Sequence, residues 1–297
     1  MKYGELNNRA ALLMLLAGAV MISFSSVWVK ICQVSPISSA FYRVLFGGLI
    51  LSVVVGYNRE FKWHGRGHFL LILLCALFFA LDLVLYHTSI HYIGPGLGTI
   101  MPNFQVFILT GFGVLFLNEK IRLRFVLSVP FAFVGLLMIV GIHFDTLEAS
   151  YKMGLFLGFS AAFFYAGFLL CLRKFQSTLR SRSSFYVLML VSLFTALFLA
   201  GEMIRTGETF VIPTLQSLLS LGALGILSQG VGFVFITNAL PRINASISGL
   251  ILLTQPAMAF VWDVIFFHRP TDLVNWAGVV LTLSAIYAAA SGRSGKT

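Results

Sequence analysis

The sequence carries very little charge. Only 10% of its 297 residues are Asp, Glu, Lys or Arg, and only ten residues are acidic. A soluble domain usually has about 25% charged and 45–50% apolar residues, whereas 59% of this chain is hydrophobic. The composition therefore excludes a soluble globular domain and an intrinsically disordered chain. It indicates a membrane protein.

Cysteines and catalytic motifs are also scarce. The three cysteines, Cys32, Cys75 and Cys171, are an odd number without close spacing, so they form neither a disulfide framework nor a zinc motif. The chain has no Ser/His/Asp spacing, no zinc-protease motif, no dinucleotide fingerprint and no complete phosphate-binding loop. We therefore expect neither an enzyme nor a bound cofactor.

One pair of histidines has the spacing of two metal ligands. His87 and His91 lie one helical turn apart, with Tyr86 and Tyr92 beside them. No third ligand has a matching spacing, and an aromatic belt at the membrane interface explains the cluster more simply. We predict no metal site.

Long apolar runs occupy most of the chain. A helix that crosses a bilayer needs about 20 apolar residues, and charges and turn residues divide the sequence into ten such segments. They lie near 10–29, 38–57, 69–92, 96–117, 124–143, 153–172, 184–204, 215–237, 244–267 and 273–291. Gly94-Pro95-Gly96 is one of the expected separators. The runs do not alternate as a membrane β-barrel requires, so the predicted fold is all-α with ten transmembrane helices.

The basic residues predict the orientation. If the helices alternate in direction, 15 Lys and Arg residues fall on the side of the N-terminus and four fall on the other side. The four are Lys30, Lys152, Arg205 and Arg269, and Arg43 lies inside a helix. By the positive-inside rule both termini face the cytoplasm of a bacterial inner membrane. The net charge of +10 then reflects contact with an anionic leaflet rather than nucleic acid.

Short matches indicate an internal duplication. Lys30 and Phe41-Tyr42 recur 144 residues later as Lys174 and Phe185-Tyr186. Gln105 and Phe116-Leu117 match Gln255 and Phe266-Phe267 at an offset of 150. The matches predict two repeats, 1–147 and 148–297, of five helices each. An odd number of helices makes the two halves insert in opposite senses, and inverted repeats of this kind commonly hold a polar site near mid-membrane.

The same segments resemble a known family. Ser38-Ser39-Ala40-Phe41-Tyr42-Arg43, Pro102-Asn103-Phe104-Gln105-Val106 and Asn275-Trp276-Ala277-Gly278 are similar to motifs of the EamA branch of the drug/metabolite transporter superfamily. The resemblance implies a carrier that moves small metabolites, often amino acids and often outward, without ATP. The family usually closes its fourth and ninth helices with Gly-Glu. Here Asn118-Glu119 and His268-Arg269 stand in these places, so an acidic residue is retained in the first half alone.

Arg43, Asp82 and Asp263 are ionisable residues within the predicted helices. Arg43 and Asp82 are expected at a similar depth, and a charge at the centre of a membrane helix costs about 2.5–3.5 kcal/mol on insertion scales. The two residues form either a substrate or proton site or an ion pair that clamps two helices together. Asp263 is expected nearer the extracellular interface.

Several amides lie in or at the ends of predicted helices. They are Asn103, Gln105, Gln229, Asn238 and Gln255. Each can bind a polar substrate or a neighbouring helix. Pro102 and Pro256 stand beside two of them and allow a kink, which favours a binding site built by both halves.

We therefore predict a secondary transporter that exports small polar metabolites by alternating access. Its expected partners are a small-molecule substrate and the lipid bilayer, and the chain works as a monomer or a homodimer. An uptake permease is the alternative within transport. A pore or another intramembrane protein is the alternative from a different class, although the chain shows no ring of like residues that would form a pore.

Overall fold

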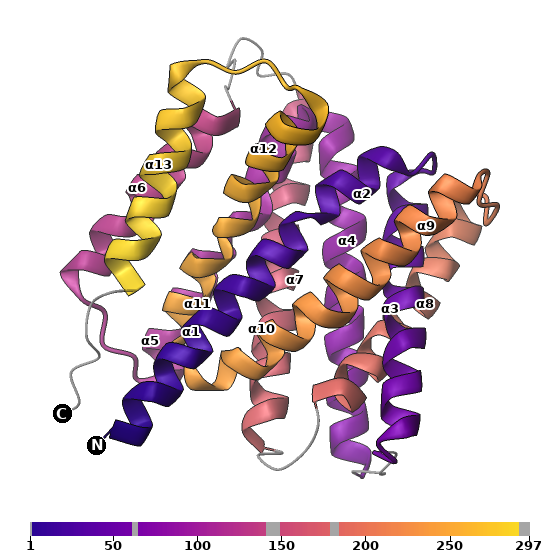
Figure 1. The fold of residues 1–297 in the computed structure, drawn as a ribbon, viewed down its shortest axis with the longest axis horizontal. Coiled ribbons are helices and arrows are strands. Elements are labelled where there is room, and N and C mark those ends of the chain that lie inside the picture. The colour runs from indigo at the N-terminus through magenta and orange to yellow at the C-terminus, as the bar shows by residue number, and fades with distance from the viewer. Residues whose placement is uncertain (1, 61–64, 141–148, 179–183, 291–297) are drawn as a thin grey trace.

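The computed structural model describes residues 2–60, 65–140, 149–178 and 184–290, and all regular structure in these ranges is helical (Figure 1). The first half contains α1 (Lys2–Ser23), α2 (Ser25–Ile31), α3 (Pro36–Tyr57), α4 (Arg66–Ile100), η1 (Met101–Phe104), α5 (Gln105–Leu117) and α6 (Leu123–Val140). The second half contains α7 (Ala149–Thr178), α8 (Ser184–Thr206), α9 (Leu215–Ala223), η2 (Leu224–Gly232), α10 (Phe233–Ala239), η3 (Leu240–Arg242), α11 (Ala245–Leu252), α12 (Thr254–Phe267) and α13 (Leu273–Ala290).

Within the described ranges, nine helical stretches are long and apolar enough to cross a membrane. A tenth apolar stretch, Met101–Leu117, is shorter. It falls within the expected segment 96–117, which begins later than predicted because α4 continues to Ile100. The coarse prediction of an all-helical, multi-pass membrane protein is confirmed.

The Gly94-Pro95-Gly96 run does not separate two helices, which corrects the prediction. The three residues lie inside α4, which has 35 residues. Glycine and proline interrupt helices in water, where the freed backbone groups can bind solvent. In a membrane helix neighbouring helices, hydroxyl side chains and small local adjustments satisfy the freed backbone groups, so the helix can continue through both residues.

Side chains at the loops set where some helices begin. The hydroxyl of Ser35 accepts a hydrogen bond from the Ser38 backbone N–H at 3.2 Å, and Pro36 opens α3. Thr214 caps α9 in the same way, through the backbone N–H of Ser217 at 3.1 Å. A side-chain oxygen at this position satisfies one of the free N–H groups of the first turn.

Helices of one half pack against helices of the other. In Figure 1, α6 lies beside α13, α3 beside α8, α4 beside α7 and α1 beside α10. Glycines allow the closest approach. A Cβ atom added at Gly135 would lie 2.7 Å from the backbone oxygen of Gly278, and one added at Gly47 would lie 2.5 Å from Cγ of Gln229. Small residues at such crossings let two backbones meet.

Two helix ends match at an offset of 150 residues. Asn118 ends α5 and His268 ends α12, both in the left-handed conformation with φ of 51° and 50°. Their backbone N–H groups bond to the carbonyl oxygens of Gly113 and Asp263, which are again 150 residues apart. The next helices, α6 and α13, have 18 residues each.

The helices that contain Gln105 and Gln255 are both interrupted near these residues. The 3₁₀ turn η1 separates α4 from α5, and Leu253 separates α11 from α12. The residues directly before α5 and α12 have nearly equal backbone angles, with φ and ψ of −60° and −11° at Phe104 and −64° and −11° at Leu253. Interrupted helices near the bilayer centre expose backbone groups where a ligand can reach them.

Candidate functional site

A cavity of about 900 Å³ lies between the two halves. Its lining comes from α1, α2, α3, α4, α6, α7, α10 and α12, with further residues from η1, α5 and η2. Lys30 and Val29 at the end of α2 and Arg269 after α12 border it at one end of the bundle. The volume falls in the range of about 300–1,000 Å³ typical of small-ligand sites.

Three aromatic rings pack together at the wall of the cavity. Phe79 stacks on Phe168 with ring centroids 4.3 Å apart, and Phe233 contacts both rings at 5.6 Å. Phe79 and Phe233 line the cavity, whereas Phe168 is fully buried behind them. The three rings join α4, α7 and α10 at this apolar part of the wall.

Arg43 and Asp82 both face this cavity. The Arg43 guanidinium lies 5.6 Å from the centroid of the Phe233 ring, and its Nε has no hydrogen-bond partner among the described residues. Asp82 is 7% exposed. The two charges interact through space, but no ion pair within 4.0 Å joins them. A direct ion pair that clamps α3 to α4 is therefore not what the structure contains.

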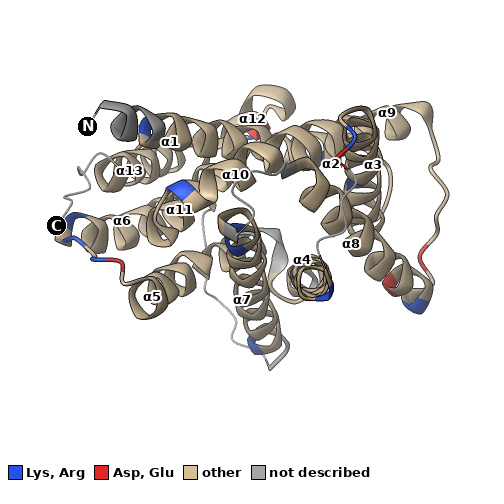
Figure 2. Cartoon of the chain, turned by 90° about the horizontal axis from the view of Figure 1, so that it is seen from below, with Lys and Arg blue, Asp and Glu red and all other residues tan. Residues whose placement is uncertain are grey.

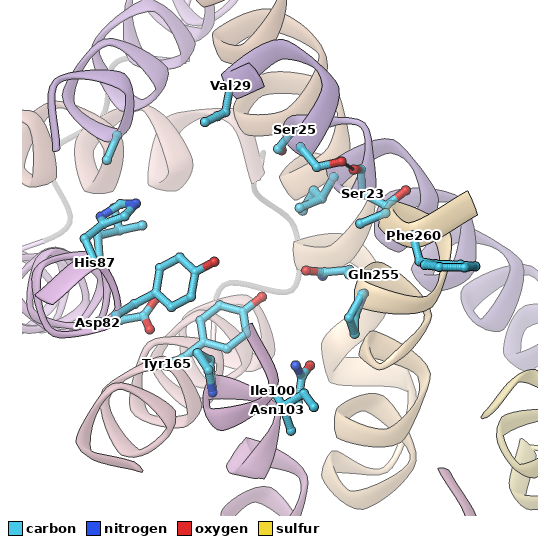
Figure 3. A pocket seen from close by; sticks show the side chains of 18 of the residues that line it. Ser23, Ser25, Val29, Asp82, His87, Ile100, Asn103, Tyr165, Gln255 and Phe260 are labelled. Carbon is cyan, nitrogen blue, oxygen red and sulfur yellow. Dashed lines mark hydrogen bonds between the residues drawn. The ribbon is translucent and has the colours of Figure 1, made fainter. Parts of the chain in front are cut away.

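Two tyrosines stand close to these charges. Tyr86 and Tyr165 line the cavity, and each interacts electrostatically with both Arg43 and Asp82. The Tyr165 hydroxyl points across the cavity towards Gln255 (Figure 3). Nε2 of Gln255 has no partner among the described residues. Donors and acceptors are thus available to a polar ligand at the centre of the bundle.

The predicted amides reach the cavity from both halves. Asn103 and Gln105 line it from η1 and α5, and Gln255 lines it from α12. Oε1 of Gln105 is buried and has no partner within the described part of the chain. Pro102 and Pro256, beside these amides, also border the cavity.

Asp263 lies at the mouth, the end of the cavity that Lys30 and Arg269 border. Its carboxylate is 2.5 Å from the Lys30 ammonium and 3.8 Å from the Arg269 guanidinium. The Lys30 ammonium also lies 4.8 Å from the Phe267 ring, and Arg269 lies 5.0 Å from the Phe260 ring. Two cations that share one carboxylate leave the mouth with a net positive charge.

Gln229 is the one predicted site residue that does not line the cavity. Its side chain is fully buried, and its Nε2 donates a hydrogen bond to the Ser192 hydroxyl at 3.0 Å. It packs between η2, α3 and α8, where Gly47 leaves room for it. Arg43, Asp82, Asn103, Gln105, Gln255 and Asp263 all border the cavity.

Sequence reasoning missed several lining residues. Tyr165 and Phe233 stand in apolar runs where an aromatic residue carries no distinctive signal. In the sequence, Lys30 and Arg269 contribute to the charge asymmetry, the repeat match and the departure from the family pattern, none of which points to a cavity. Lys30 and Arg269 are two of the four basic residues expected on the side opposite the N-terminus. Their rarity there is the signal that could have identified the mouth.

No group of three or more His, Cys, Asp or Glu residues within the described ranges could hold a metal ion. His87 borders the cavity, whereas the side chain of His91 lies outside the described part of the chain. The donor set at the cavity is therefore suited to an organic ligand, with amides, hydroxyls and two opposite charges.

The fold and cavity define a multi-pass helical membrane protein with a polar, metabolite-sized cavity at its centre. The model of the EamA-like transporter family matches residues 9–141 and 152–291. The chain belongs to this family, whose members are membrane transporters of the drug/metabolite transporter superfamily.

The fold is also found among solved structures. One crystal structure, described only as that of a protein, has a TM-score of 0.81 at 16% sequence identity, over 94% of this chain and 97% of the other. At this identity the likeness concerns the fold alone. The search of curated proteins returned no match.

Proposed function

We propose that the chain is a secondary transporter of small zwitterionic metabolites, such as amino acids or related compounds, and that it works as an exporter by alternating access. Membership of the EamA-like family supports transport. The cavity supports the substrate class, and the absence of a complete phosphate-binding loop from the sequence supports transport without ATP.

The observation that carries the substrate class is the pair Arg43 and Asp82. Both line one cavity, and neither has an ion-pair partner within 4.0 Å among the described residues. An isolated charge in a bilayer is costly unless a partner or water compensates it. A ligand that carries a carboxylate and an ammonium group would compensate both charges at once, with the carboxylate on Arg43 and the ammonium group on Asp82.

Two inverted repeats of five helices each, 1–147 and 148–297, are the proposed basis of alternating access. The equal backbone angles at Asn118 and His268, and at Phe104 and Leu253, support this arrangement. The pairing of α6 with α13 and of α3 with α8 supports it too, since corresponding helices of two repeats meet at a pseudo-two-fold axis. The cavity lies between the halves, as the mechanism requires.

We further propose that both termini face the cytoplasm of a bacterial inner membrane. The start of α1 and the end of α13 lie at the same end of the bundle (Figure 1). Figure 2 views the molecule from that end and shows basic segments at the ends of several helices. The positive-inside rule assigns this end to the cytoplasm, so the cavity mouth faces the opposite side.

Counterflow into proteoliposomes tests the proposal. Vesicles loaded with one unlabelled amino acid would receive either the labelled amino acid, its decarboxylated amine or its N-acetylated acid. Only the zwitterion should accumulate, because each analogue leaves one of the two charges without a partner. Equal accumulation of an analogue would contradict the zwitterion assignment, and no accumulation of any amino acid in a broad panel would contradict the substrate class. Net transport of the zwitterion from the periplasmic to the cytoplasmic side would favour the uptake permease over the exporter.

A further inference from the structure

At the end of the bundle opposite the cavity mouth, the carboxylate of Glu119 joins the two halves by hydrogen bonds. This residue follows α5 and is 6% exposed as a side chain. Its Oε1 accepts a hydrogen bond from the Ala245 backbone N–H at 2.6 Å. Its Oε2 accepts bonds from the Ser246 backbone N–H at 3.2 Å and from the Ser246 hydroxyl at 2.7 Å. Glu119 therefore caps the N-terminus of α11.

An arginine completes this cluster. Nη2 of Arg173, on α7, lies 3.7 Å from Oε1 of Glu119. Nη1 of the same side chain donates a hydrogen bond to the carbonyl oxygen of Ile243 at 2.6 Å, directly before α11. Charge-assisted hydrogen bonds are stronger than neutral ones, and here they link Glu119 of the first half to α11 of the second, while the ion pair with Arg173 links it to α7. We call Glu119, Arg173, Ala245 and Ser246 the clasp.

The backbone conformation at the end of α5 fixes the position of Glu119. Asn118 adopts the left-handed conformation, and the Glu119 N–H bonds to the Gly113 carbonyl at 2.9 Å. A Cβ atom at Gly113 would lie 2.5 Å from Oε2 of Glu119. Only glycine at this position lets the carboxylate lie against α5 while it reaches across to α11.

At the mouth the exposed Lys30 joins the halves through its ion pair with Asp263, but within the described residues no carboxylate there caps a helix of the other half. Arg269 follows α12 where Glu119 follows α5, and the two helix ends share the same backbone turn. Arg269 cannot accept hydrogen bonds, so it cannot cap a helix as Glu119 does. It borders the cavity instead and lies 3.8 Å from Asp263. The two ends of the bundle are thus chemically unequal.

We infer that Glu119 is a positioning residue for transport, which favours the conformation that is closed at the end of the termini and open at the other. This inference rests on the alternating access proposed above. The clasp joins the halves in the closed conformation and must break before the cavity can open at that end. A contact made in only one of two states shifts the equilibrium towards that state by its differential free energy. The contact between the halves at the mouth is the ion pair of the exposed Lys30 with Asp263, and exposed ion pairs stabilise little, so the two ends are not equally held.

The test measures from which side the cavity is reached, so it needs no substrate. A reporter variant, Ala259→Cys, places a thiol on α12 in the cavity lining, in a background where Cys32, Cys75 and Cys171 are replaced by alanine. Right-side-out and inside-out vesicles are treated with a membrane-impermeant thiol reagent, and the ratio of the two labelling rates is recorded. The parent should react faster from the mouth side.

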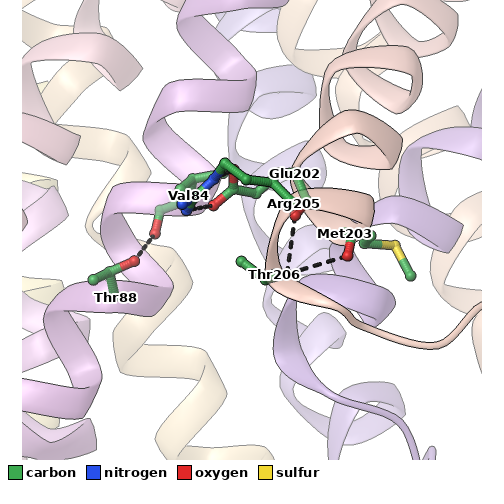
Figure 4. Close-up of polar contacts among 6 residues, drawn as sticks. All are labelled: Val84, Thr88, Glu202, Met203, Arg205 and Thr206. Carbon is green, nitrogen blue, oxygen red and sulfur yellow. Dashed lines mark hydrogen bonds and ion pairs between the residues drawn. The ribbon is translucent and has the colours of Figure 1, made fainter.

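Glu119→Gln should shift this ratio towards the terminal side by about tenfold, within the usual range of conformational coupling. Ser246→Ala should shift it in the same direction by less, and Glu119→Asp should retain part of the parent ratio. Glu202→Gln is the matched control. Glu202 pairs with Arg205 at 2.6 Å on a single helix, α8, close to Thr206 (Figure 4), so its loss should leave the ratio unchanged.

Three results would overturn the inference. They are equal reactivity of the parent from both sides, an unchanged ratio in folded Glu119→Gln, and an equal shift in Glu202→Gln. If Glu119→Gln does not fold, Ser246→Ala decides, and an unchanged ratio in that variant overturns the inference. Because no transport is measured, a failure here is distinct from a failure of the proposed substrate class.

Discussion

Asp82→Asn separates a role in transport from a role in stability. The side chain faces the cavity, is 7% exposed and has no ion-pair partner within 4.0 Å in the described ranges. Asparagine keeps its shape and removes its charge. If Asp82 binds the ammonium group of a substrate, the variant should fold normally and transport poorly.

The expected magnitudes follow from the geometry. Removing a charge from the middle of a membrane helix relieves a cost of about 2.5–3.5 kcal/mol. The lost attraction to Arg43, which is more than 4.0 Å away, is worth less than about 4 kcal/mol at an effective dielectric constant of 20. These terms nearly cancel, so the free energy of unfolding should change by only about 1 kcal/mol. A lost charge-assisted hydrogen bond to substrate costs about 1.5–3 kcal/mol, which raises the half-saturation concentration by about 10- to 150-fold.

Thermal unfolding in detergent and counterflow in proteoliposomes would be measured for Asp82→Asn, Arg43→Gln and the double variant, with Glu202→Gln as control. All four should unfold near the parent temperature, and the first three should lose transport of the zwitterion. A marked loss of stability in each single variant, with recovery of stability and transport in the double variant, would refute this reasoning. That result would show that Arg43 and Asp82 act as an ion pair that holds α3 and α4 together.

Three further outcomes follow from the same structure. Reporter fusions after Thr297 should read cytoplasmic and those after Thr206 periplasmic, and a periplasmic C-terminus together with a cytoplasmic N-terminus would rule out five helices in each half. Gly135→Ala should destabilise the protein by about 1–3 kcal/mol in thermal unfolding, because its Cβ would lie 2.7 Å from a backbone oxygen of α13. Gly201→Ala is the control: its Cβ meets nothing within 4 Å, so the variant should be neutral or slightly stabilising. Gln229→Leu should leave the half-saturation concentration of substrate unchanged in counterflow, since Gln229 lies outside the cavity. A large change would show that Gln229 contributes to substrate binding.

Much of the fold could be predicted because the bilayer imposes simple rules. Apolar runs of about 20 residues must form helices there, and segments such as 38–57 and 273–291 lie close to α3 and α13. The error at Gly94-Pro95-Gly96 came from applying the turn chemistry of soluble proteins to a membrane helix. The breaks at Phe24 and Leu253 and the π-helical turn of η2 depend on tertiary packing, such as the stacking of Phe24 on Trp262, which no local pattern records.

The charged and amide residues of the site could be predicted from the sequence, but their contacts could not. Arg43 and Asp82 stand out because charged residues are rare in apolar runs, and the matches at an offset of 150 drew attention to Gln105 and Gln255. The sequence could not tell whether Arg43 and Asp82 touch, because that depends on how α3 and α4 pack. It also could not tell that Gln229 faces α8, since an amide on a buried helix can point to a cavity or to a neighbour equally well.

Protection of two cavity cysteines by substrate tests most directly whether the cavity between the halves is the transport site. Asn103→Cys places a thiol on the first half and Gln255→Cys places one on the second, each at the cavity lining. Both thiols should react with a small polar reagent in the functional protein, and one transported zwitterion should slow both reactions over the same concentration range. If either thiol stays unreactive, or if the zwitterion protects neither in a protein that transports it, the cavity is not the transport site.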